Sequence, residues 1–113
     1  MKTTASLLYE IDYGSSKDDV LSKLPLLADK INNIVLKIKE CETIEDAEYY
    51  IALLESIHSL IIRLKFKKGL EIWGSLWEFT RHLDRIDAEI TQKIIFDEIK
   101  NGEFPLIDKN NLF

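Results

Sequence analysis

The chain has 113 residues, of which 46% are hydrophobic, and its formal net charge is −5. This length and apolar content predict one folded domain over residues 1–113 and argue against a disordered chain. The acidic balance, with no basic run beyond Lys65, Lys67 and Lys68, excludes nucleic acid as an expected partner.

The sequence indicates neither export nor membrane insertion. Its N-terminal residues lack the apolar core of a signal peptide. No uncharged stretch approaches the roughly 20 apolar residues of a membrane span. Cys41 is the only cysteine, which excludes an internal disulfide and a thiolate metal cage. We therefore expect a cytoplasmic protein.

The first predicted element is a short helix over Thr4–Asp12. It places Leu7, Leu8 and Ile11 on one side, and Gly14 is expected to end it as a C-terminal cap.

A second helix is predicted from apolar residues that recur at alternating steps of four and three. Ser16, followed three residues later by Asp19, is its start signal. Because an interior proline disrupts helical hydrogen bonding, Pro25 predicts a short turn over Lys17–Leu24 and then a helix to about Glu40. A kinked continuous helix is the alternative, since the stripe keeps its phase across the proline. The stripe consists of Val20, Leu24, Leu27, Ile31, Ile34, Ile38 and Cys41.

A third helix is predicted from Thr43, a capping residue with Asp46 three positions later, to about Lys67, where Gly69 stops it. Its apolar arc covers roughly half of the helix circumference, which requires partners on two sides. We therefore expect this helix to lie between the others. Its apolar residues include Tyr50, Ile51, Leu53, Leu54, Ile57, Leu60, Ile61, Ile62 and Leu64.

The last helix is predicted over Leu70–Lys100, with a bend or break near Thr91–Lys93, where the apolar stripe loses phase. Gly74 either permits close helix packing or places the true start at Ser75. The apolar tail residues within Glu103–Phe113 are expected to fold back. The predicted fold is all-α: an up-down three-helix bundle with an additional short N-terminal helix and a folded-back C-terminal tail.

The residues that usually carry chemistry are sparse. His58 lies at the edge of an apolar arc, which favours a core-edge histidine with one hydrogen bond over a catalytic one. Glu78 and His82 share a helical face, but two ligands do not make a metal site. Cys41 closes an apolar stripe and is interpreted as a small core residue. We expect no catalytic residue, no metal and no cofactor.

Two tryptophans and several acids are the predicted partner-binding residues. Trp73 and Trp77, four apart, lie beside the core stripe, and Thr80, Asp84, Asp87 and Thr91 continue the same side. The tryptophans either cover the core edge beneath the terminal segments or anchor a partner, since tryptophan is frequent at binding hot spots. The full predicted set is Trp73, Trp77, Asp84, Asp87, Glu45, Asp46 and Glu48.

These features favour a protein-binding module, most simply a stoichiometric inhibitor such as a bacterial immunity protein or antitoxin. Its acids would complement a basic, nuclease-type toxin. A structural or adaptor bundle is the second hypothesis, with a homodimer that packs along the long last helix. A Mg²⁺-dependent nucleotide hydrolase is the third, in which Glu45, Asp46 and Glu48 would face Asp84 and Asp87.

Overall fold

A computed structural model describes residues 3–13, 16–84 and 91–112. Helices account for most of this part of the chain, which contains no strand. The α-helices are α1 (Thr4–Asp12), α2 (Lys17–Glu40), α3 (Ile44–Ile62), α4 (Ser75–Asp84) and α5 (Thr91–Lys100). A π-helical turn, η1 (Arg63–Lys67), continues α3, and a 3₁₀ turn, η2 (Lys109–Asn111), lies in the tail. The all-α bundle predicted from the sequence is thus confirmed.

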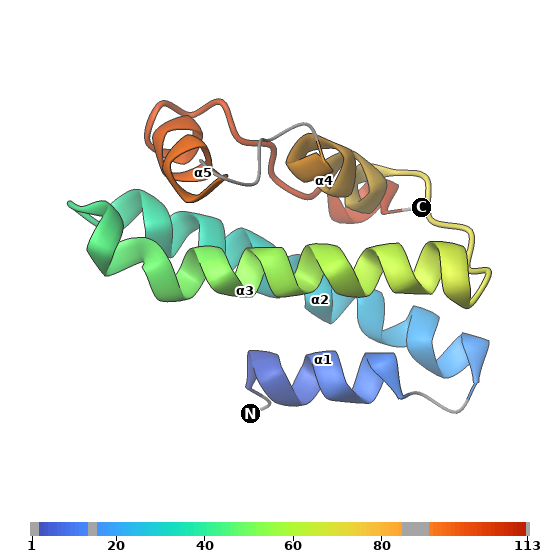
Figure 1. Ribbon diagram of the computed structural model, residues 1–113. Helices are drawn as coiled ribbons and strands as arrows, with labels where there is room; N and C mark the ends of the chain where they lie inside the picture. The colour runs from blue at the N-terminus through green and yellow to red at the C-terminus, as the bar shows by residue number, and fades with distance from the viewer. Residues whose placement is uncertain (1–2, 14–15, 85–90, 113) are drawn as a thin grey trace.

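The helices are arranged around the long pair α2 and α3. Figure 1 shows α1 on one side of this pair, and α4, α5 and the C-terminal tail on the other. Helix α3 contacts α1, α2, α4 and α5. Its wide apolar arc therefore predicted its central place correctly.

Side-chain caps fix the starts of the first three helices. The hydroxyls of Thr3, Ser16 and Thr43 each accept a hydrogen bond from the backbone N–H three residues later, at 3.1–3.2 Å. Such caps satisfy donors that a helix leaves unpaired at its start. The bounds predicted for α1 and the start signals at Ser16 and Thr43 are confirmed. Gly14, the predicted end of α1, lies outside the described residues.

Pro25 does not interrupt α2. The turn predicted over Lys17–Leu24 is wrong, because the helix is continuous from Lys17 to Glu40 with the proline inside it. Proline removes one backbone hydrogen bond, the one its N–H would give to the carbonyl of Leu21. Burial of the apolar stripe on both sides of the proline, including Val20 and Leu27, outweighs that loss.

The single helix predicted over Leu70–Lys100 is also wrong. Residues 70–74 are not helical, α4 begins at Ser75, and α5 begins at Thr91. The alternative start at Ser75 is therefore the observed one, and Thr91–Lys93, where a bend or break was predicted, lie within α5. Residues 85–90 lie outside the described part. The homodimer hypothesis assumed a last helix that begins near Leu70, whereas residues 70–74 are not helical.

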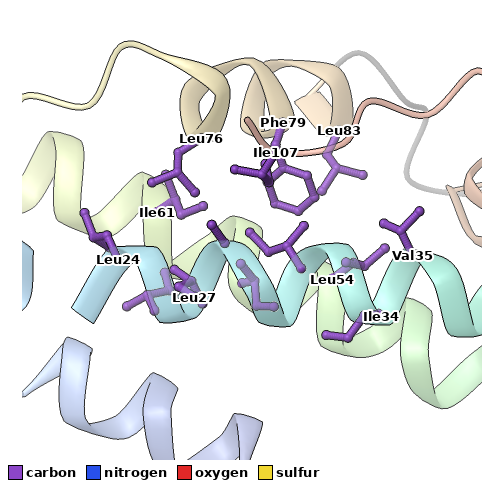
Figure 2. Packing of buried hydrophobic residues seen from close by; sticks show 14 of the residues in the cluster. Leu24, Leu27, Ile34, Val35, Leu54, Ile61, Leu76, Phe79, Leu83 and Ile107 are labelled. Atoms are coloured by element: carbon purple, nitrogen blue, oxygen red, sulfur yellow. The ribbon is translucent and has the colours of Figure 1, made fainter. Parts of the chain in front are cut away.

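The stripes of the sequence form one core. Figure 2 shows Leu76, Phe79 and Leu83 of α4 directed toward the α2–α3 pair, with Ile107 of the tail beside Phe79. Phe104, Ile107 and Leu112 are buried, so the predicted return of the tail onto the bundle is confirmed. Within the described residues, no helix is both long and apolar enough to cross a membrane.

Candidate partner-binding surfaces

An aromatic patch formed by Phe66, Trp73 and Trp77 lies where η1 meets the start of α4. Phe66 and Trp73 are 67% and 65% exposed, whereas Trp77 is half-buried against the core. The rings of Phe66 and Trp77 pack edge to face with centroids 5.7 Å apart, and those of Trp73 and Trp77 do so at 6.3 Å. Edge-to-face contacts of this kind hold aromatic rings in defined orientations.

The side chain of Lys65 contacts both tryptophan rings. Its Nζ lies 3.1 Å from the ring centroid of Trp73 and 4.5 Å from that of Trp77, and it donates a 3.0 Å hydrogen bond to the carbonyl of Ile72. A cation over an indole face is an attractive arrangement. The ammonium therefore links η1 to residues 72–77 and orders the exposed indole of Trp73.

The chain reversal at Gly69 creates this contact. Gly69 has a positive φ of 68°. The Leu70 N–H donates a hydrogen bond to the Leu64 carbonyl at 3.0 Å, which ends η1, and the chain then reverses its direction. Residues 70–73 then alternate, with Leu70 and Ile72 buried and Glu71 and Trp73 exposed. This alternation of period two, which is typical of an extended segment, places Trp73 on the surface.

The structure divides the predicted tryptophan pair. Trp77 covers the edge of the core, as the structural interpretation expected, while Trp73 precedes α4 and is largely exposed. The two residues do not lie on one helix, although their rings meet. Phe66 and Lys65 were not predicted members of this surface, because their contacts depend on the reversal at Gly69.

The structure differs from the prediction at the residues that were expected to continue the side of the tryptophans. Thr80 is fully buried and its hydroxyl donates to the Leu76 carbonyl, so its predicted place on an exposed strip is wrong. Asp84 is exposed, but its Oδ1 lies 2.7 Å from Nε2 of His58 on α3. His58 is thus the core-edge histidine with one hydrogen bond that the sequence favoured. Asp87 lies outside the described residues.

The other predicted acids, Glu45, Asp46 and Glu48, form a separate surface together with Glu42, which was not predicted; these four residues are called the acidic edge. All four are exposed, and so is Tyr49, whose ring contacts that of Tyr50 at 5.5 Å. Glu48 and Phe66 are separated by about 27 Å along the helix axis at 1.5 Å per residue. The acidic edge and the aromatic patch therefore occupy opposite ends of α3.

This separation parts Asp84 from the other described carboxylates of the Mg²⁺ hypothesis, whose remaining member, Asp87, lies outside the described residues. Asp84 lies beside His58, about 15 Å along α3 from Glu48 at 1.5 Å per residue. Within the described ranges, no group of three or more His, Cys, Asp or Glu side chains is placed to hold a metal ion. His82 contacts Glu98 on α5, and Cys41 is half-buried with its thiol directed at the Lys37 carbonyl.

Comparison with known proteins gives one result. The model of a protein family described as immunity protein CdiI-like matches residues 3–101, which include both surfaces. No curated protein and no solved structure gives a significant match.

Proposed function

This chain belongs to the CdiI-like family of immunity proteins, and we propose that it is a stoichiometric, non-enzymatic inhibitor of a nuclease-type toxin in the bacterial cytoplasm. Membership of an immunity protein family implies a protein toxin as partner. The proposal goes further in the chemical class of that toxin and in the surface that meets it.

The acidic edge is the observation that carries the proposal. Its four carboxylates lie within seven residues, 42–48, and none makes an ion pair with another described residue. Unpaired exposed acids raise the negative potential that a partner meets. A nuclease binds phosphate groups through a basic surface, which is complementary to such an edge.

Inhibition would require no chemistry from this chain. Carboxylates on the acidic edge would occupy the positions at which the toxin binds phosphate groups, so that the nucleic acid is excluded. Complementary charge mainly accelerates association and is weakened by salt. The exposed ring of Tyr49 would add apolar contact beside the charges, as aromatic residues do in many interfaces.

The test uses as binding partner the toxin of this immunity protein, to be sought among the products of the neighbouring genes. Glu45→Lys should slow association about tenfold or more at low salt, with a smaller effect at high salt. Asp18→Lys is the matched control, because Asp18 is likewise an exposed acid at the second position of a helix, α2. The control should lose similar helix stability and bind normally.

Two results would refute this function. One is that the purified neighbouring protein does not bind the wild-type chain. The other is that binding leaves its nuclease activity on RNA and DNA unchanged at a one-to-one ratio.

A further inference from the structure

We propose that the toxin interface runs along the outer face of α3, from the acidic edge to the aromatic patch, and that the patch is its main anchor. This inference rests on the proposed function. It adds a second binding surface, a preorganising role for Lys65, and a toxin surface that is basic at one end and apolar at the other.

The outer face of α3 connects the two surfaces, with Arg63, whose guanidinium is bonded to Asp12 of α1, between Ser59 and Phe66. It lies opposite the buried stripe and is not covered by another helix (Figure 1). Between its ends it presents three small, exposed side chains at helical spacing: Ala52, Ser56 and Ser59. A flat partner surface can therefore contact Tyr49 and Phe66 at the same time.

The dimensions agree with one protein interface. A standard interface buries about 800 Å² on each partner, which corresponds to a disc of roughly 32 Å diameter. The separation of Glu48 and Phe66, about 27 Å at 1.5 Å per residue, lies within that diameter. One toxin domain can thus cover both ends of the face.

The aromatic patch is ordered before any partner arrives. Lys65 holds the indole of Trp73 through its ammonium, and that indole also packs against Trp77. Exposed aromatic side chains that are already ordered lose little entropy on binding, which favours affinity. Trp73 and Phe66 therefore have the properties of interface hot spots.

The charges near the patch differ from those at the acidic edge. Lys65 and Lys67 lie on η1, while the exposed acids Glu71 and Glu78 flank the tryptophans in sequence. With Lys68, which follows η1 and is also exposed, the cations outnumber these acids, so this end does not share the negative charge of the acidic edge. A basic toxin surface is therefore not favoured here, and the exposed rings fit an apolar part of the toxin.

Alanine substitutions in the patch provide the first test, with the toxin identified among the products of the neighbouring genes as probe. Trp73→Ala and Phe66→Ala should each weaken binding about 30-fold or more, mainly through faster dissociation. Leu26→Ala and Leu36→Ala are the controls, since Leu26 and Leu36 are large exposed apolar residues of α2. The controls should bind within about threefold of wild type.

A second pair of variants separates the positioning role of Lys65 from its charge. Lys65→Met removes the cation and keeps an unbranched side chain, whereas Lys67→Met makes the same charge change at an exposed neighbour. In a Trp77→Phe background, Lys65→Met should increase the mobility of Trp73 measured by fluorescence anisotropy and weaken binding. Lys67→Met should change neither.

A bulky residue in the middle of the face provides the third test. Ser56→Arg should weaken binding, whereas Asn33→Arg on the exposed side of α2 should not. If Trp73→Ala and Ser56→Arg bind as wild type does while Glu45→Lys binds poorly, this inference fails and the proposed function stands. If the wild-type chain does not bind the toxin, the proposed function itself fails.

Discussion

Asn32 on α2 forms two hydrogen bonds with the backbone of Ile107, 75 residues later. Its Nδ2 donates to the Ile107 carbonyl at 3.0 Å, and its Oδ1 accepts from the Ile107 N–H at 2.8 Å. One side-chain amide thus satisfies both backbone groups of a tail residue whose side chain is buried. The adjacent Asp108 is linked by two further bonds to the Ser75 hydroxyl, so the tail joins α2 to the start of α4.

Replacing Asn32 by alanine should therefore loosen the tail. Both backbone groups of Ile107 would lose their partner, which costs about 1–3 kcal/mol of unfolding free energy. Urea denaturation measures this loss, and amide exchange at Ile107 should accelerate. Asn33→Ala, at an exposed neighbouring position, should change stability by less than about 0.5 kcal/mol. Equal denaturation midpoints for the two variants would contradict the role given to Asn32.

Gly69→Ala should reduce both stability and toxin binding. A Cβ at Gly69 would meet nothing within 4 Å, so the cost comes from the positive φ alone and is about 1–2 kcal/mol. Gly69→Asn should cost less, because asparagine tolerates this conformation better. The reversal at Gly69 brings Lys65 to Trp73, and strain there should disorder the patch.

Gly102→Ala is the control for this prediction. Gly102 has φ 74° and equally open surroundings, but it follows α5, away from the patch. Thermal unfolding should show similar losses for both alanine variants, while only Gly69→Ala weakens binding. A binding defect of the same size in Gly102→Ala would show that general destabilisation causes the effect.

Thr80→Val should be nearly neutral, within about 1 kcal/mol. The Thr80 hydroxyl donates to the Leu76 carbonyl, which also accepts the helical N–H of residue 80, so its removal leaves no unpaired buried group. Thr80→Asp should unfold the domain, since it would bury an unpaired charge. Circular dichroism during heating measures both. If the Thr80→Asp variant folded, residue 80 would be accessible to solvent, as its position in the sequence suggested.

The parts of the fold that the sequence predicted correctly have local causes. Spacing of Leu24, Leu27 and Ile31 identifies the buried face of α2, and caps at Ser16 and Thr43 mark helix starts. Each of these signals acts within one or two turns of helix. The wide apolar arc of α3 also revealed its central place, because each helix that packs on it needs its own apolar strip.

Two errors came from competing signals. At Pro25 the local cost of proline suggested a break, but burial of apolar residues on both sides keeps α2 continuous. Over residues 70–74 the spacing of Ile72 and Leu76 imitates a helix, although Leu70 and Ile72 also alternate with Glu71 and Trp73. That period-two signal was present and would have identified the extended segment.

The candidate site was only partly predictable. Trp73 and Trp77 stand out in the sequence because they lie beside the apolar stripe. Lys65 reaches them only through the turn at Gly69, which no local pattern specifies. Likewise, the sequence does not indicate that Asp84 meets His58, since 26 residues separate them.

The last prediction compares two predicted partner-binding acids in different surroundings, Asp84 and Glu48. Asp84 contacts His58 at 2.7 Å, whereas Glu48 is exposed and makes no ion pair with a described residue. Asp84→Asn should lower stability by about 0.2–1 kcal/mol, because the pair is partly exposed, and should leave toxin binding nearly unchanged.

Glu48→Gln should have the opposite effects on stability and toxin binding. The glutamine keeps the size of the side chain but removes a charge from the acidic edge, so association should slow at low salt while the unfolding free energy stays within about 0.5 kcal/mol of wild type. Stopped-flow association at two salt concentrations and urea denaturation provide the two readouts. If Asp84→Asn instead slowed association without loss of stability, the His58 pair would be incidental. Asp84 would then contact the toxin directly, and the interface would extend from α3 onto the end of α4.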